Sequence, residues 1–172
     1  AKARTLNTFD INPADGNYDG KKSKTSSNNQ IPLLFDNQTI TNPNILNTTN
    51  GSPFTVFQVP NDGWYKIYVK IDAQYTDSGS GNMSFYYNVN KASTIDLGTG
   101  VITGGTSITA GDNCSYYSNT ASGCAGTVEE RFLKSGEFIY INISSWTING
   151  SGPPADAINI TSNSELIIKQ VN

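Results

Sequence analysis

The chain has 172 residues, of which 36% are hydrophobic and 15% are charged, and its formal net charge is -3. This length suits a single domain that buries roughly two thirds of its unfolded surface. The acidic balance argues against a general nucleic-acid binder, which needs a strongly basic face. The lack of a long apolar run argues against insertion into a membrane.

Residues 1–30 have no sustained hydrophobic period and are rich in Gly, Asn and Ser. Five cationic and three acidic side chains give residues 1–24 a charge of +2, whereas the remaining chain carries -5. We predict an extended N-terminal arm over residues 1–30, with a short strand at 5–9, ahead of one domain at 31–172. In this interpretation the arm contacts neighbouring subunits, and a solvated polar tail is the alternative.

Within the arm, the run from Asp15 to Gly20 matches the first half of a calcium-binding loop. The side chains of Asp15, Asn17 and Asp19 alternate as oxygen donors, and the final glycine permits the sharp turn. The position that usually holds a bidentate glutamate is Ser26, and no flanking helix is evident. A plain turn is the better interpretation, so we predict no metal and no cofactor, with calcium as the alternative.

The strongest structural signal is the alternation from Gly63 to Tyr75. The odd positions form a face that suits an apolar interior: Tyr65, Ile67, Val69, Ile71, Ala73 and Tyr75. The even positions offer charge, amide groups or an aromatic ring: Trp64, Lys66, Tyr68, Lys70, Asp72 and Gln74. Because successive strand side chains point to opposite faces, this period predicts a long strand with one buried and one exposed face.

Shorter β-rich segments precede and follow this strand, at 31–35, 54–59, 83–89, 127–133, 138–144 and 166–171. In 138–144 the residues Ile139, Ile141 and Ile143 share one face. The segment 94–111 favours short strands at best. Gly, Asn and Pro turns separate the segments, and no window shows a helical period. Roughly seven to ten short strands of this kind predict an all-β antiparallel sandwich or barrel.

Cys114 and Cys124 are separated by nine residues that are rich in turn formers. This spacing suits a loop-closing disulfide, which would stabilise the fold by roughly 2–3 kcal/mol. A disulfide favours an oxidising destination, and two free thiols are the alternative. Eight Asn-x-Ser/Thr sequences occur in the chain, and one of them begins at Asn142, whose mid-strand position argues against glycosylation.

The chain offers few candidates for catalysis. It has no histidine, so acid–base catalysis through imidazole is excluded. Glu129 and Glu130 precede Arg131, and on an alternating strand the two carboxylates point to opposite faces. We predict structural ion pairs there rather than a paired acid–base site, and we predict that the protein is not an enzyme.

Three segments carry a family resemblance. Residues 59–65 open the long strand, a Gly-Glu turn in 133–140 leads into another strand, and 164–169 form the terminal strand. Their order and spacing resemble the jelly roll of the tumour-necrosis-factor-like group, which includes complement-type globular heads and domains of phage and viral spike or capsid proteins. The resemblance covers residues 31–172. It implies an antiparallel jelly-roll β-sandwich that forms a homotrimer.

Large rings on the exposed side suit the subunit interface that this resemblance implies, because they supply much apolar area at modest entropic cost. The candidates are Trp64, Tyr68, Tyr86, Phe138 and Tyr140. The alternative is that these rings belong to the core of the second sheet or sit singly on the surface. The resemblance also implies that a ligand is held by apical loops or between subunits, and Tyr116 and Tyr117 are candidates for such a loop.

These features together predict a non-enzymatic virion structural protein, a spike, vertex or capsid component, on the virion surface or in another extracellular setting. The expected partners are further copies of the chain, neighbouring virion or filament subunits through residues 1–30, and a host-surface glycan or protein receptor. One alternative is a secreted bacterial or archaeal adhesin or pilus subunit that donates the arm as a strand. Another is a carbohydrate-binding module with an aromatic platform at Tyr116 and Tyr117.

Overall fold

The computed structural model describes most of the body and parts of the N-terminal region. The described residues are 2–4, 9–11, 23–25, 31–35, 37–38, 43–49, 54–76, 82–108, 112–117, 122–124, 128–149, 157–160 and 164–171. Their side chains are described at 32–35, 43–49, 54–71, 87–108, 128–142 and 164–171. Every regular element in these ranges is a β-strand.

The first sheet is built around β8 (Gly63–Thr76), which pairs with β18 (Glu165–Val171) on one side and with β15 (Val128–Leu133) on the other. Five shorter strands extend it: β1 (Lys2–Arg4), β2 (Phe9–Ile11), β5 (Asn37–Gln38), β14 (Ser122–Cys124) and β17 (Ala157–Ile160). All of these pairings are antiparallel.

The second sheet is built around β9 (Asn82–Ala92) and β16 (Phe138–Asn149), which pair antiparallel along most of their length. Six shorter strands extend it: β3 (Ser23–Thr25), β4 (Ile31–Pro32), β6 (Ile45–Asn47), β7 (Thr55–Gln58), β12 (Thr106–Ser107) and β13 (Asp112–Tyr117). A separate hairpin joins β10 (Thr94–Ile95) to β11 (Ile102–Thr103).

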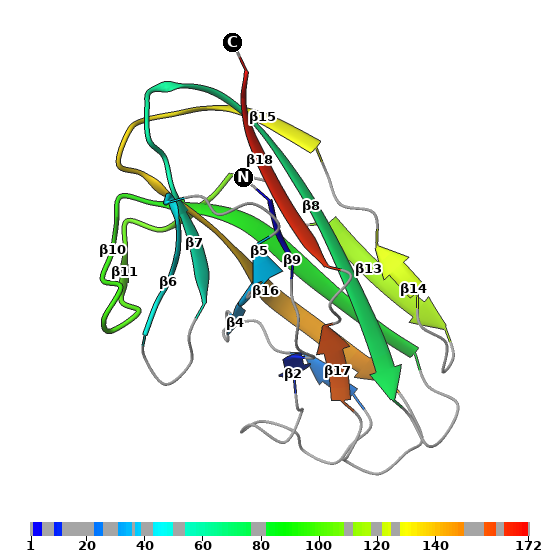
Figure 1. Ribbon diagram of the computed structural model, residues 1–172. Helices are drawn as coiled ribbons and strands as arrows, with labels where there is room; N and C mark the ends of the chain where they lie inside the picture. The colour runs from blue at the N-terminus through cyan, green and yellow to red at the C-terminus, as the bar shows by residue number, and fades with distance from the viewer. Residues whose placement is uncertain are drawn as a thin grey trace.

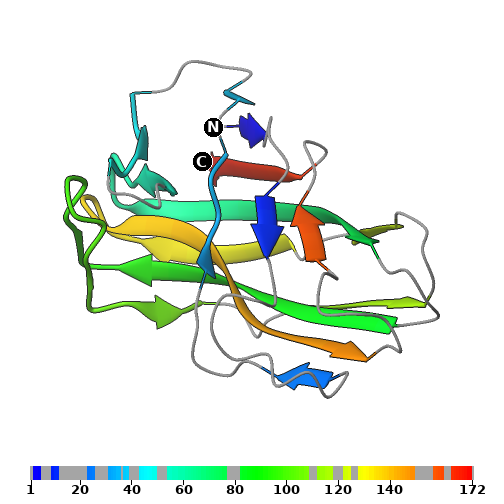
Figure 2. The same ribbon diagram turned by 90° about the horizontal axis from the view of Figure 1, so that it is seen from below.

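The chain crosses repeatedly between the two sheets. It runs from β7 in the second sheet to β8 in the first, then to β9, β15, β16 and β18 in alternating sheets. Figure 1 shows β8 beside β18, and Figure 2 shows these two strands in a layer above β9 and β16. This arrangement confirms the predicted all-β, antiparallel jelly-roll β-sandwich.

The main core lies between the two sheets. Tyr65, Ile67, Val69 and Ile71 of β8 are 2% exposed or less, so the predicted alternation is confirmed from Trp64 to Ile71, and the side chains of Ala73 and Tyr75 lie outside the described ones. The four buried side chains pack with apolar side chains from both sheets: Leu33, Phe35, Ile45, Phe57, Val59, Tyr87, Val89, Leu133, Ile139, Ile141, Leu166 and Ile168. Fully burying each large aliphatic side chain stabilises the fold by roughly 1.5–3 kcal/mol.

A second cluster covers the outer face of the second sheet. In β16, Ile139 and Ile141 face the main core, and the alternate residues Phe138 and Tyr140 belong to this second cluster. It also contains Phe54, Val56, Ala92 and Ile95, with Leu46, Leu97 and Ile102 packed against them. The β10–β11 hairpin therefore lies over this part of the sheet, and residues 138–142 of β16 are buried on both faces.

The described segments of residues 1–30 pair with the body. β1 pairs with β18, β2 pairs with β17, and β3 pairs with β16. The expectation of an arm outside the body is corrected for these segments, because their backbone groups are satisfied by strands of the same chain. Such three-residue strands carry no readable period, so the sequence pattern missed them.

Candidate functional site: the open face of the first sheet

The outer face of the first sheet carries a regular array of side chains from three strands. The cross-strand register aligns them in three rows, each with one residue from β15, one from β8 and one from β18. The rows are Phe132, Trp64 and Val171, then Glu130, Lys66 and Lys169, and then Val128, Tyr68 and Ile167. We call these nine residues the open face.

The first row is apolar and exposed. Trp64 is 55% exposed, Phe132 is 49% exposed and Val171 is 42% exposed. The rings of Trp64 and Phe132 form an edge-to-face pair, with centroids 6.0 Å apart and planes at 78°. An edge-to-face pair contributes about 0.5–1.5 kcal/mol beyond its buried area. Adjacent exposed apolar side chains of this size are typical of interaction surfaces.

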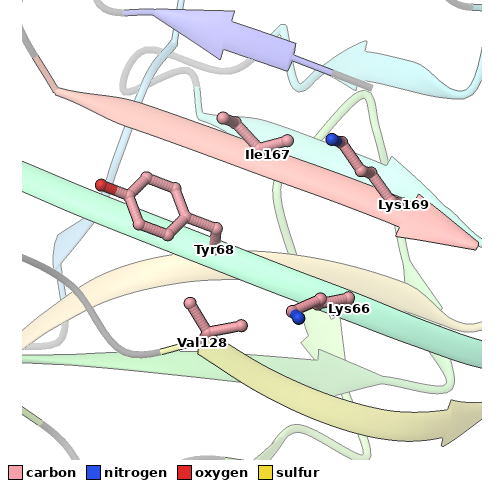
Figure 3. A pocket seen from close by; sticks show the side chains of 5 residues that line it. All are labelled: Lys66, Tyr68, Val128, Ile167 and Lys169. Carbon is pink, nitrogen blue, oxygen red and sulfur yellow. The ribbon is translucent and has the colours of Figure 1, made fainter.

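The third row forms a shallow groove with a volume of about 300 Å³. It is lined by Tyr68, Val128 and Ile167, with Lys66 and Lys169 at one side. Figure 3 shows that these side chains come from β8, β15 and β18. The groove continues the apolar character of the first row on the far side of the charged row.

The middle row is charged. The Nζ atom of Lys66 lies 3.8 Å from Oε1 of Glu130, and both side chains are more than half exposed. Lys66 and Lys169 lie directly opposite each other in the register of β8 and β18. Like charges in this position destabilise a strand pair unless an anion lies nearby.

The two neighbouring carboxylates of β15, Glu129 and Glu130, have different ion-pair partners. Glu130 is on the open face, whereas Oε2 of Glu129 lies 2.9 Å from Nη2 of Arg131. Arg131 also donates through Nε to the carbonyl of Ile108, at 3.1 Å, and so links the edge of the first sheet to the segment after β12. The two glutamates therefore form separate ion pairs, as the alternation predicted.

The structure separates the five predicted interface rings. Trp64 is exposed and Tyr68 is half-buried, both on the open face. Phe138 is 9% exposed and Tyr140 is 3% exposed within one chain, and burial raises the pKa of the Tyr140 phenol. These two residues are therefore corrected from interface to core, because the β10–β11 hairpin covers them. Tyr86 lies on β9, and its side chain is outside the described part of the structure.

The remaining predicted residues fall partly outside the description. Asp15, Asn17 and Asp19 lie outside the described residues. Tyr116 and Tyr117 lie on β13 opposite Met83 and Asn82, and Cys114 and Cys124 lie on β13 and β14. For these four, the backbone is described and the side chain is not. The ligand loop and the disulfide therefore stay predictions.

Sequence reasoning missed the open-face residues of β15 and β18. Phe132, Val128, Ile167 and Val171 are apolar residues on short strands, and nothing in their own segments says that they lie beside Trp64 and Tyr68. Alternation within each strand could have identified them. Leu133, Leu166 and Ile168 face the core, so the residues next to them in the chain face outward.

The described residues offer neither a metal site nor a membrane-spanning helix. No group of three or more His, Cys, Asp or Glu side chains in the described ranges is arranged to hold a metal ion. The same ranges contain no helix with the length and apolar character needed to cross a lipid bilayer.

No family model matches the chain, and no curated protein matches its sequence. Among solved structures, the chain is similar to the Eiger TNF from S. frugiperda, with a TM-score of 0.41 and 16% sequence identity. The match covers 99% of this chain and 94% of that chain.

Proposed function

We propose that the chain is a structural protein that associates with further copies of itself through the open face, as a spike, vertex or capsid component of a virion. The observation that carries the proposal is the exposed first row, in which Trp64, Phe132 and Val171 are adjacent and 42–55% exposed. Tryptophan is enriched among the residues that dominate protein–protein affinity.

The apolar rows supply the driving force for association. Burying apolar surface contributes about 25 cal/mol per Å², and Trp64, Phe132 and Val128 each still expose about half of their surface. Association must also offset about 4–15 kcal/mol of lost translational and rotational freedom. The nine open-face residues are therefore the centre of a larger contact, in which both apolar rows are covered together.

A virion or other extracellular setting is supported by composition. Only 15% of residues are charged, so the surface is kept soluble mainly by neutral polar groups. The family resemblance implies a homotrimer. The open face suits such a contact because β8, β15 and β18 all contribute apolar side chains to it. The alternative of a pilus subunit that donates its N-terminal arm is less favoured, because β1, β2 and β3 pair with their own chain.

The test is the oligomeric state of the purified chain. We expect association at about 100 µM, measured by sedimentation velocity, corresponding to a free energy of at least about -5 kcal/mol. The double variant Trp64→Ala/Phe132→Ala is expected to shift the equilibrium to the monomer. The matched control is Val101→Ala, which removes a side chain that is 60% exposed on the β11 side of the hairpin.

A wild-type chain that stays monomeric at this concentration would overturn the proposal. So would an oligomer that the double variant leaves intact, because the open face would then not be the contact. Both variants should fold as monomers, since neither Trp64 nor Phe132 belongs to the two core clusters, and the double variant should lose only the roughly 1 kcal/mol of the ring pair.

A further inference from the structure

The charges of the open face are distributed unevenly across the sheet, from the β15 side to the β18 side. In the middle row Glu130 stands on β15, Lys66 on β8 and Lys169 on β18, so the negative charge lies at one side and the excess positive charge at the other. The next charged row along β8 differs, because Lys70 lies opposite Glu165 and opposite charges meet within the chain. Only the middle row is left electrostatically one-sided.

Both sides of the middle row are accessible to another molecule. On one side, β15 pairs with β8, and no other described strand pairs with it. On the other side, β1 reaches β18 only at residues 165–167, so Lys169 and Val171 lie beyond the paired segment. Within the described residues, Lys169 has no carboxylate within ion-pair distance.

We propose that in the assembly the β15 side of one copy lies against the β18 side of the next, so that Glu130 forms an ion pair with Lys169 of the next copy. This inference rests on the proposed function, since it assigns the register of the same contact. The occupant of the open face is a second copy of this chain, and the argument is charge complementarity.

Symmetry decides between the possible orientations. A rotation axis parallel to β8 keeps the rows level and brings β15 of one copy to β18 of its neighbour. Phe132 then meets Val171 of the neighbour, Val128 meets Ile167 of the neighbour, and Glu130 meets Lys169 of the neighbour. The residues of β15 and β18 are therefore matched in every row, apolar with apolar and negative with positive, and Lys66 is the one charged residue of the row that faces its own counterpart.

The other face-to-face orientation mismatches the middle row. A two-fold axis perpendicular to β8 and lying in the plane of the face exchanges the two apolar rows, which is tolerated. It also sets Glu130 against Glu130 of the neighbour, Lys66 against Lys66 and Lys169 against Lys169. The Lys66 contact is common to both orientations, so the difference lies in Glu130 and Lys169, which form opposite-charge pairs in the first orientation and like-charge contacts in this one; like charges brought together at an interface oppose association.

Charge reversal tests the pairing. Glu130→Lys and Lys169→Glu are each expected to raise the dissociation constant of the oligomer about tenfold, and the double variant Glu130→Lys/Lys169→Glu is expected to return it to near the wild-type value. The measurement is sedimentation equilibrium at low salt, where surface charge pairs are least screened. Thr94→Lys and Thr94→Glu, on the exposed side of the hairpin, are the controls for a charge change away from the open face.

The outcomes separate this inference from the proposed function. If the wild-type chain is monomeric, the proposed function itself fails. If the chain associates and Trp64→Ala/Phe132→Ala dissociates it, but the double reversal is no tighter than the single ones, the open face stands and this pairing is overturned. Thermal unfolding of each variant confirms that it is folded, which is expected because Glu130 and Lys169 are both exposed.

Discussion

At the scale of single residues, a buried polar contact joins Asn90 and Asn142. The amide nitrogen Nδ2 of Asn90 donates to Oδ1 of Asn142 at 2.8 Å, and the two side chains are 4% and 0% exposed. They sit on the face of β9 and β16 that the second cluster covers. A shift in the register of β9 and β16 would separate the two amides and leave each of them buried without this hydrogen bond. Because an unpaired buried amide is destabilising, the pair favours the observed register.

Asn142→Ala is expected to lower the free energy of unfolding by about 2 kcal/mol, because Asn90 loses its short hydrogen bond inside the protein. Urea unfolding measures the change. Thr94→Ala, at an exposed strand position, is the control and should change stability by less than about 0.5 kcal/mol. If the two variants are equally stable, the amide pair makes no net contribution.

Glu137 ties the turn before β16 to β9. Its Oε1 accepts from Nζ of Lys91 at 2.8 Å, and its Oε2 accepts from the backbone N–H of Lys134 at 2.9 Å. Burial by itself raises the pKa of Glu137. The hydrogen bonds from Lys134 and Lys91 and the charges of both lysines outweigh burial, so the pKa lies below its ordinary value.

This shift sets the sign of a pH dependence. Because the folded-state pKa of Glu137 is lowered, its stabilisation is present above the usual pKa of 4.5 and is lost as the pH falls through the folded-state pKa. Glu137→Gln is therefore expected to cost about 1 kcal/mol at neutral pH and clearly less near pH 3. Urea unfolding at the two pH values measures this, and an equal cost at both would contradict it.

At the scale of strands, alternation predicts a strand only where one face is exposed. β8 was readable because Lys66, Lys70 and Trp64 separate its buried residues. β16 was readable only in part, since its second face is also buried and Phe138 and Tyr140 resemble exposed interface rings. What covers them is a hairpin of two-residue strands, and such short elements have no period. The same limit applied to the candidate site. Trp64 and Tyr68 could be predicted from the alternation of β8, whereas their neighbours on β15 and β18 could be identified only from the register of the strand pairs.

The hairpin itself can be tested as a cover. Ile95→Ala is expected to lower the free energy of unfolding by about 2–4 kcal/mol, because Ile95 is 5% exposed and packs in the second cluster. Val101→Ala, in the same hairpin but 60% exposed, should cost less than about 0.5 kcal/mol. Comparable losses in the two variants would mean that the hairpin does not cover the sheet in solution.

At the scale of the whole molecule, the two cysteines gain a meaning that their spacing did not suggest. Cys114 lies on β13, which pairs with β9 of the second sheet, and Cys124 lies on β14, which pairs with β8 of the first. A disulfide between them would therefore join the two sheets rather than only close a loop. Sequence spacing could not show this, because it does not say which sheet each strand enters.

Reduction tests the predicted bond. We expect intact mass analysis without reductant to show no thiol available for alkylation in the denatured chain. The double variant Cys114→Ser/Cys124→Ser is then expected to lose roughly 2–3 kcal/mol of stability, since the unfolded chain is no longer constrained. Two alkylated thiols in the unreduced protein would remove the prediction.

If the chain assembles as proposed, the hairpin over the second sheet limits how far assembly can proceed. A sandwich with adhesive surfaces on both outer sides would stack without end, because every added copy would offer a fresh surface to the next. Here β10 and β11 cover the second cluster on one side, and among the side chains that the structure describes the exposed array of rings and charges lies on the side of β8, β15 and β18. In the proposed assembly, copies that meet through the open face around a closed rotation axis form a particle of fixed size, and removing the hairpin would expose the second cluster as a further adhesive surface.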